Sequence, residues 1–200
     1  MKNLFAILIV LLLSGIAGAK AQDKKQPSNA EMQDVMKKWM EAATPNEHHK
    51  ALDGMVGKWN METTTWMDPG APPMKTKGTA EISWMIDGRF LKQDAKGEFM
   101  GGPFIGFGLT GYDNNKKCYT MLWIDNTTTA MSAAEGNFNE SGKIMTMYGK
   151  MDEPTTGEHD KNVKYVLKII DKDSFLFEVH DLSLDEPHTK TMEIAYTRAK

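Results

Sequence analysis

Gly57-Lys58-Trp59-Asn60-Met61-Glu62-Thr63 is the stretch that decides the fold, because an alternation with a period of two begins here. The chain ends on a second stretch of the same kind, Ile194-Ala195-Tyr196-Thr197-Arg198. The first and last strands of a closed barrel are neighbours, so Trp59 and Arg198 can stack there as a cation–π pair. We therefore expect Gly57, Trp59 and Arg198 to form the structural closure at one end of a β-barrel.

Between these two stretches the sequence reads as short strands joined by tight turns, with no helices interleaved. Turn-forming sequences such as Asp87-Gly88 and Ser141-Gly142 separate them. The expected strands cover residues 57–67, 74–86, 89–98, 103–112, 117–125, 128–135, 143–151, 162–171, 174–182 and 189–198. This pattern predicts an all-β fold, an antiparallel up-and-down barrel of about ten strands, with a two-sheet sandwich as the alternative.

Residues 1–21 have the pattern of a cleaved secretory signal peptide. Lys2 precedes an apolar run, 4–13, that is too short to span a membrane comfortably, and Ala19-Lys20-Ala21 offers a cleavage site. We therefore expect a periplasmic or secreted protein that is cleaved after Ala21 and has no membrane span in its mature form. Residues 22–27 read as a disordered linker.

A helical segment, 28–56, is expected between this linker and the barrel domain, 57–200. Ser28 and Glu31 have the spacing of a capping box, and Pro45 suits the first position of a second, short helix. The first helix carries one apolar face, made of Met32, Val35, Met36, Trp39 and Met40. That face must be covered by something, and the sequence does not indicate what covers it.

Charge and cysteine content limit the classes of partner. Removing Lys2 and Lys20 with the signal peptide lowers the basic residues from 24 to 22 against 27 acidic ones, a net charge of −5. The basic residues are scattered, which argues against nucleic acid and anionic membrane surfaces as main partners. Cys118 is the only cysteine, so no intramolecular disulfide forms, and its place in a strand pattern favours a small buried residue.

Alternation along the strands predicts an inner face that is aromatic, aliphatic and rich in methionine. On the second strand, for example, Ile82, Trp84 and Ile86 share one side and Glu81 and Ser83 the other. The same reasoning selects the residues we expect to contact a ligand: Trp84, Met121, Trp123, Met145, Met147 and Phe177.

Residues 106–111 match the G-x-G-x-x-G pattern of dinucleotide-binding loops. Such a loop must lead into a helix, whose positive end meets the pyrophosphate, but here a turn and another strand follow. We therefore expect Gly106, Gly108 and Gly111 to permit barrel curvature or the close approach of a ligand.

No cofactor, metal site or catalytic residue is predicted. The 16 methionines could in principle bind copper(I), but they lie where an apolar face needs filling. The histidines match no zinc motif, and none is placed inward where it could hold haem. There is no Gly-x-Ser-x-Gly motif, and Asp94, Asp125 and Glu135 are candidate acids only because they lie near strand ends.

The order of several short motifs resembles the calycin superfamily of lipocalins and related barrels. More closely, the chain resembles an exported bacterial family catalogued as a domain of unknown function (one-five-seven-nine), over about residues 47–198. The motifs are Gly57-Lys58-Trp59, Asp87-Gly88-Arg89-Phe90-Leu91, Phe107-Gly108-Leu109-Thr110-Gly111-Tyr112-Asp113, Gly136 with Gly149, and Ile194-Ala195-Tyr196-Thr197-Arg198. The resemblance implies a lipocalin-like barrel and no known reaction.

Taken together, the sequence predicts an exported lipocalin-like protein that binds a small apolar or amphipathic molecule. Two alternatives stay open. One is an enzyme with an acid/base site in the lumen, and the other is a structural or envelope-interaction protein whose barrel is filled solid. The sequence leaves the oligomeric state open.

Overall fold

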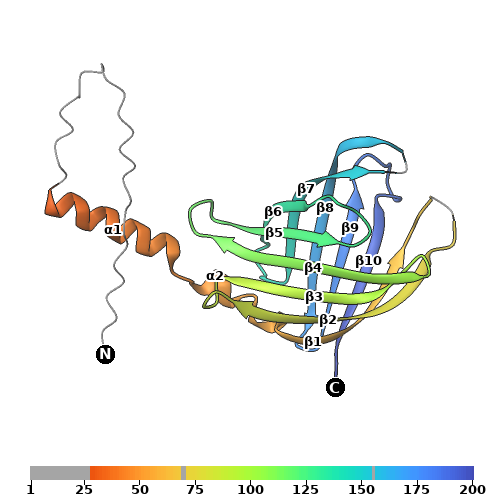
Figure 1. Ribbon diagram of the computed structural model, residues 1–200, viewed down its shortest axis with the longest axis horizontal. Helices are drawn as coiled ribbons and strands as arrows, with labels where there is room; N and C mark the ends of the chain where they lie inside the picture. Colours follow the sequence, from red (N-terminus) through yellow and green to blue (C-terminus); the bar gives the residue numbers. More distant parts are fainter. Residues whose placement is uncertain (1–27, 69–70, 155) are drawn as a thin grey trace, which may run out of the picture. The chain divides into compact units, whose positions relative to one another are not determined.

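The computed structural model describes residues 28–68, 71–154 and 156–200, which form a closed antiparallel barrel preceded by helices (Figure 1). The predicted signal peptide, its cleavage site and the linker 22–27 lie outside the described residues. The chain divides into two units, residues 1–37 and 38–200, and the barrel belongs entirely to the second.

Ten strands close the barrel in the order β1-β10-β9-β8-β7-β6-β5-β4-β3-β2, each antiparallel to its neighbours. They are β1 (Gly57–Thr65), β2 (Met74–Met85), β3 (Phe90–Phe99), β4 (Gly102–Asp113), β5 (Cys118–Asp125), β6 (Ser132–Phe138), β7 (Ile144–Glu153), β8 (Glu158–Asp171), β9 (Ser174–Asp181) and β10 (Lys190–Arg198). The predicted ten-stranded barrel is confirmed, and the two-sheet alternative is wrong.

Two strands differ from their predicted bounds by more than two residues. The expected strand 128–135 begins later, at Ser132, because Thr127 hydrogen-bonds to the Asp125 carboxylate and Ala130 to the Thr128 hydroxyl, which folds 126–130 into turns. The same strand continues through Gly136, where a Cβ would collide with the backbone of β7. Strand β8 starts at Glu158, four residues before the predicted start at 162.

Helix α1 (Asn29–Ala43) has the predicted capping box: the Ser28 N–H donates to the Glu31 carboxylate at 2.7 Å, and the Glu31 N–H donates to the Ser28 hydroxyl at 3.3 Å. The boundary between the two units falls within this helix, after Lys37. Its apolar residues are all about half exposed or more: Met32, Val35, Met36, Trp39 and Met40.

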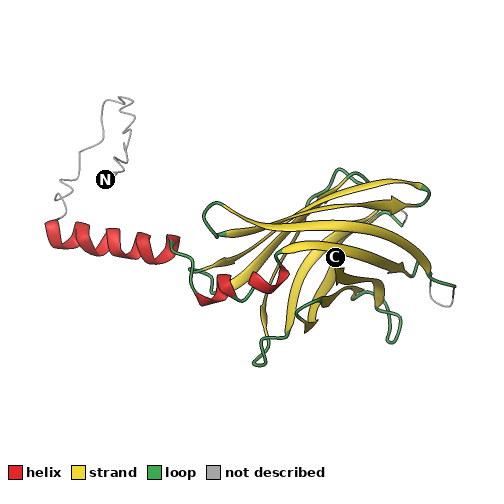
Figure 2. Ribbon diagram, turned by 90° about the horizontal axis from the view of Figure 1, so that it is seen from below, coloured by secondary structure: helices red, strands yellow, loops and turns green. Residues whose placement is uncertain are grey.

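Two short helical elements, α2 (Glu47–Lys50) and η1 (Asp53–Met55), lie at the end of the barrel where β1 begins and β10 ends (Figures 1 and 2). We call this the closed end, and the opposite one the far end. Pro45 was predicted at the first position of this helix, but α2 begins at Glu47. Asn46 is its N-cap, and the Asn46 side chain accepts the His48 N–H. Leu52, between the two elements, is fully buried in the barrel core.

Trp59 and Arg198 meet at the closed end. The guanidinium carbon of Arg198 lies 4.2 Å from the centre of the Trp59 ring, well within cation–π range. Arg198 also donates to the carbonyl oxygens of Gly54, Val56 and Lys172 at 2.7–3.2 Å. These bonds join η1 to the β8–β9 turn, so Arg198 holds together segments that are far apart in sequence.

Gly57 is required next to this contact. It has a φ of +137°, and a Cβ at this position would lie 2.6 Å from an Arg198 nitrogen. The glycine of the Gly57-Lys58-Trp59 motif therefore leaves space for the Arg198 guanidinium.

Asn114, in the β4–β5 turn, connects the barrel to the segment that precedes α2. Its amide nitrogen donates to the carbonyl oxygens of Ala42 and Thr44 at 3.0 and 2.9 Å, and its oxygen accepts from the Asn46 amide at 2.8 Å. One side chain thus satisfies carbonyl groups at the end of α1 that have no partner within the helix.

Replacing Asn114 by alanine is expected to lower the free energy of unfolding by about 1–2 kcal/mol, because these bonds are lost together. Asn114→Asp should cost more, since it turns a carboxylate toward carbonyl oxygens. Urea denaturation measures both changes, and hydrogen exchange should show faster exchange in residues 38–50. Asn115→Ala, on the exposed neighbour, is the control. Equal stability of the Asn114 and Asn115 variants would contradict the role given to Asn114.

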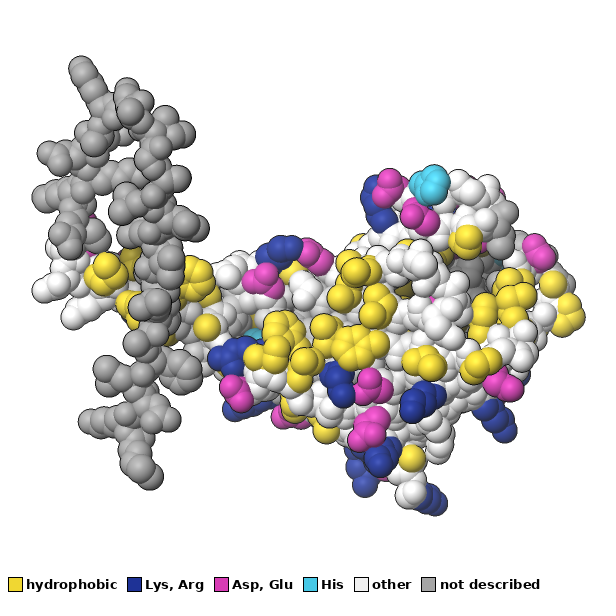
Figure 3. Space-filling view, viewed as in Figure 1, with side chains coloured by type: hydrophobic (Ala, Val, Ile, Leu, Met, Phe, Trp, Pro, Cys, Tyr) yellow, Lys and Arg dark blue, Asp and Glu magenta, His cyan; other side chains and the backbone are white. Residues whose placement is uncertain are grey.

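The outer wall of the barrel is a mixed surface. Figure 3 shows hydrophobic side chains over β3, β4 and β5, among acidic and basic ones. Phe90, Ile105 and Ile124 are among the exposed hydrophobic residues on these strands.

Candidate functional site

The pairing register defines which side chains face the barrel interior, because residues paired across antiparallel strands share a face. Trp59 pairs with Ala80, and Tyr165 pairs with both Met147 and Val179, so these belong to one inner face. The fully buried inner residues form a single core: Trp59, Met61, Ala80, Ile82, Leu91, Ala95, Tyr119, Ala134, Met145, Met147, Val163, Tyr165, Leu167, Phe175 and Tyr196.

A second group of inner-face residues packs against this core but remains partly accessible to solvent. It includes Met121 and Trp123 on β5, Phe177 and Val179 on β9, and Ile194 on β10. Side chains that face inward and still contact solvent indicate that the interior is not completely filled by protein. The barrel interior is therefore the first candidate site.

The six predicted ligand-binding residues all belong to this interior cluster, but in different surroundings. Met121, Trp123 and Phe177 are in the partly accessible group. Met145 and Met147 are 2% and 1% exposed, so they form part of the packed core. Trp84 lies toward the closed end, where its indole N–H donates to the Asp53 carboxylate of η1 at 2.8 Å.

The indole of Trp123 explains the first two glycines of the G-x-G-x-x-G match. A Cβ on Gly106 or Gly108 would collide with or press against this ring, so both glycines make room for it on the inner face. The indole N–H donates to the Asp125 carboxylate at 2.8 Å, which fixes the ring. Gly111 likewise makes room for Phe90, on the outer face. The pattern therefore accommodates aromatic rings.

A buried ion pair lies on the inner face near the far end. Lys161 is in register with Met151, and Asp181 with the core residue Val163; the ammonium group is 2.6 Å from the Asp181 carboxylate. Both side chains are less than a tenth exposed. Glu158 is also within 3.2 Å of the Lys161 nitrogen. The inner face thus carries a buried charged pair at this end of the barrel.

This environment keeps Asp181 ionised. Burial alone would raise its pKa, but hydrogen bonds from Lys161 and Ser183 and the charge of Lys161 outweigh burial and hold the pKa below its ordinary value of 3.8. The hydrogen bond to Asp181 likewise raises the pKa of Lys161 above 10.5.

The strand pattern read from the sequence did not predict this pair. Asp181 continues the inward alternation of Phe177 and Val179, but the predicted strand containing 162–171 started one residue after Lys161. Extending the period of two backward from Val163 would have placed Lys161 on the inner face.

A second polar contact lies deeper in the interior. Gln93 donates from its amide nitrogen to the Tyr196 hydroxyl at 3.0 Å. Burial raises the pKa of Tyr196 to about 12, so the phenol is neutral at physiological pH.

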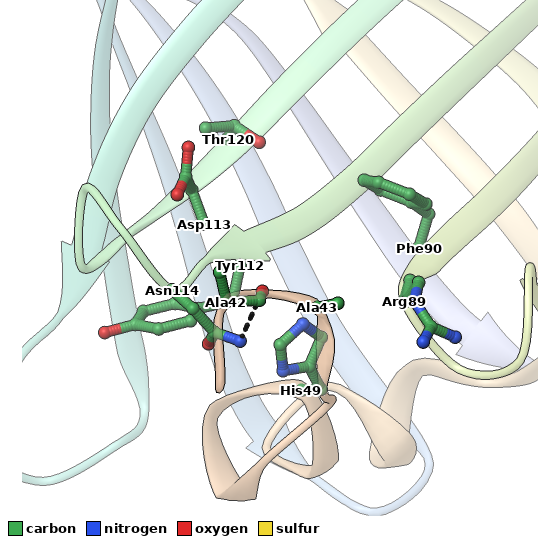
Figure 4. A pocket seen from close by; sticks show the side chains of 9 residues that line it. All are labelled: Ala42, Ala43, His49, Arg89, Phe90, Tyr112, Asp113, Asn114 and Thr120. Carbon is green, nitrogen blue, oxygen red and sulfur yellow. Dashed lines mark hydrogen bonds between the residues drawn. The ribbon is translucent and has the colours of Figure 1, made fainter. Parts of the chain in front are cut away.

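The second candidate site is a hollow of about 230 Å³ at the closed end, on residues of the unit 38–200 (Figure 4). Elements distant in sequence form it: the end of α1, α2, the β2–β3 turn, and strands β3 to β5. Its lining residues are Ala42, Ala43, His49, Arg89, Phe90, Tyr112, Asp113, Asn114 and Thr120. In Figure 4, Arg89 and Phe90 stand on one side of the hollow and Asp113 and Asn114 on the opposite side, with Ala43 and His49 between them.

His49 lines this hollow with a neutral imidazole ring that is held by hydrogen bonds. Burial, and then the charges of His48 and Arg89, lower its pKa below 6.5, against a hydrogen bond to the Tyr112 backbone that raises it. Its Nδ1 atom accepts the Asn46 N–H at 3.1 Å, which makes it the partner in the α2 capping box.

The other residues considered as acids or reactive groups lie outside both sites. Asp94 pairs with Lys92 at 2.7 Å, and Glu135 forms an ion pair with Lys116. Burial raises the pKa of the Cys118 thiol, which disfavours the reactive thiolate. In the part of the chain that the structure describes, no group of three or more His, Cys, Asp and Glu side chains could hold a metal ion. Within that same part, no helix is long and apolar enough to cross a membrane.

Comparison with known proteins gives a family and a fold. The family model described as "Protein of unknown function (DUF1579)" matches residues 44–198. No curated protein matches the chain.

Among solved structures, the crystal structure of Rv2717c from M. tuberculosis aligns with a TM-score of 0.56 and 13% identity, covering 78% of this chain and 100% of that one. Two further matches are a redesigned β-barrel, b11L5F_LGL (TM-score 0.41, 13% identity, 75% and 96% coverage), and the redesigned barrel mFAP1 bound to DFHBI (0.40, 11%, 74% and 98%). At these identities the likeness to Rv2717c shows the fold alone.

Proposed function

We propose that this chain, which belongs to the family of proteins of unknown function DUF1579, is an exported protein that binds a small apolar or amphipathic molecule inside its barrel. The observation that carries this proposal is the set of inner-face side chains that remain accessible, namely Met121, Trp123, Phe177, Val179 and Ile194. Such a wall lowers the free energy of an apolar molecule that displaces water from it.

The polar groups of the interior favour an amphipathic ligand. The Lys161–Asp181 pair lies near the far end of the inner face, and the Gln93–Tyr196 contact lies deeper. A molecule with one polar end could place that end beside the ion pair and its apolar body along β5 and β9.

The alternative of an acid/base enzyme is less well supported. Asp181, the buried interior acid, has a lowered pKa and remains ionised at neutral pH, so it cannot act as a proton donor there. Asp125 accepts hydrogen bonds from Trp123 and Thr127, which occupy its oxygens. These acids are used to fix the structure of the interior.

Binding can be tested by titrating the mature chain with dodecanoate and dodecanol while following tryptophan fluorescence, and by native mass spectrometry of the freshly purified protein. Phe177→Ala, on the inner face, is expected to weaken binding about tenfold, equivalent to about 1.4 kcal/mol of lost apolar contact. Leu176→Ala, on the outer face of the same strand, should leave the affinity unchanged. Equal affinities of these two variants, or an apo mass together with no saturable binding, would refute the proposal.

A further inference from the structure

The hollow at the closed end contains a cation whose hydrogen-bonding capacity is largely unused. Nη1 of Arg89 donates to the Ile86 carbonyl at 3.2 Å, while Nε and Nη2 form no hydrogen bond with the described residues. The nearest carboxylate, on Asp87, is 3.9 Å away and 97% exposed, so this ion pair is weak. The free nitrogens can therefore form the paired donor fork with which arginine binds carboxylates.

Beside this cation the wall of the hollow is apolar. The Phe90 ring lies over Gly111, where any side chain would collide with it, and Ala42 and Ala43 present methyl groups. Figure 4 shows Phe90 directly above Arg89 at the edge of the space. A cavity of about 150 Å³ holds benzene in another protein, so 230 Å³ has room for a ring with a small polar substituent.

The other charged and titratable groups around the hollow do not neutralise Arg89. His49 is neutral at pH 7, because burial lowers its pKa below 6.5 and its Nδ1 accepts the Asn46 N–H. Asp113 is acidic, but its carboxylate accepts the N–H groups of Asn115 and Lys116 and is directed away from Arg89 in Figure 4. The edge of the hollow that Arg89 lines is consequently electropositive.

Two of the motifs on which the family resemblance rests meet here. Arg89 and Phe90 come from the stretch 87–91, and Tyr112 and Asp113 from the stretch 107–113. Strands β3 and β4 bring them together, since Phe90 pairs with Gly111. The proposed interior site does not use these residues.

We propose that this hollow is a second binding site, which takes a small carboxylate-bearing molecule with an apolar body. The guanidinium of Arg89 binds the carboxylate, and Phe90 with the two alanines contacts the body. Phe90 and Gly111 lie on the outer face of their strands, so the part of the hollow that Phe90 lines faces away from the barrel interior.

Benzoate is a suitable probe. Acetate, which lacks the ring, and benzyl alcohol, which lacks the charge, are the comparison ligands. In an NMR titration of the mature chain, benzoate should shift the resonances of His49 and Phe90 in a saturable way. It should also raise the pKa of His49, because the bound anion offsets the charge of Arg89. Acetate and benzyl alcohol should each bind at least tenfold more weakly.

Arg89→Gln should weaken benzoate binding at least tenfold, and Arg89→Lys should bind with intermediate affinity because it keeps the charge without the fork. Lys92→Gln, on β3 three residues after Arg89, is the matched control and should bind as the wild type does. Thermal unfolding of each variant establishes that it is folded. Phe177→Ala should leave this binding unchanged, which separates the result from the test of the interior site. Equal benzoate affinity of Arg89→Gln and wild type, or shifts confined to Trp123 and the interior, would overturn the proposal.

Discussion

Arg198→Ala is expected to lower the free energy of unfolding by about 3 kcal/mol, a large effect for one residue near the end of a chain. Arg198 donates to three backbone carbonyls and to Asp173, and a hydrogen bond to a charged group contributes about 1.5–3 kcal/mol. Its stacking on Trp59 adds about 1 kcal/mol. These contributions do not add up in full, because all of the contacts depend on one position of the Arg198 side chain.

Arg198→Lys should recover only part of this loss. A lysine has one nitrogen, which cannot reach the Gly54, Val56 and Lys172 carbonyls together. Urea denaturation with an unchanged m-value measures the effect. Lys172→Ala, at a side chain 91% exposed in the same region, is the control and should change stability by less than about 0.5 kcal/mol. If the Arg198 and Lys172 variants were equally stable, the closure of the barrel would not depend on this arginine.

Asp181→Asn is expected to destabilise the protein by about 3 kcal/mol at pH 7, because it leaves the buried Lys161 ammonium with only the half-exposed Glu158 as a charged partner. The exposed pair Lys150–Asp160 offers a matched comparison: its side chains are 61% and 76% exposed, so Asp160→Asn should cost at most about 1 kcal/mol. Replacing both buried partners, in Lys161→Met with Asp181→Leu, should restore most of the stability, since no unpaired charge then remains.

The pH dependence follows from the direction of the Asp181 pKa shift. A carboxyl group with a lowered folded-state pKa contributes stability above its unfolded-state pKa and loses it as the pH falls through the folded-state value. The difference between wild type and Asp181→Asn should therefore be constant between about pH 5 and 8 and shrink below about pH 4. Urea denaturation across this range measures it. A difference that persisted unchanged down to pH 2 would show that the charge of Asp181 is not what stabilises the fold.

The sequence predicted those parts of the fold that depend on local chemistry. The period of two that begins at Gly57, with turns such as Asp87-Gly88, was sufficient to predict ten antiparallel strands and a barrel. Strand ends were less predictable: β6 starts late because Asp125 and Thr128 bind backbone N–H groups of residues 126–130. Here side-chain oxygens compete with the neighbouring strand for backbone N–H groups. The outcome depends on local geometry, which a pattern of hydrophobic residues does not contain.

The sites were predicted less completely than the fold. Alternation placed Trp123 and Phe177 on the inner face, but it could not tell that Met145 is packed tightly while Met121 retains access to solvent. The Arg89 hollow could not be predicted, because its walls come from a helix end, a turn and three strands that only the fold brings together.

The sequence by itself determined the barrel, its inner face and the two residues that meet at its closed end, because alternation and turn chemistry are local properties. Only the tertiary structure decided what those residues do there. Arg198 stacks on Trp59 and also donates hydrogen bonds to carbonyl oxygens of η1 and of the β8–β9 turn. It can do so because the pairing of β1 with β10 places these segments side by side. The Lys161–Asp181 pair and the cation at the edge of the hollow arise in the same way, from packing between distant segments.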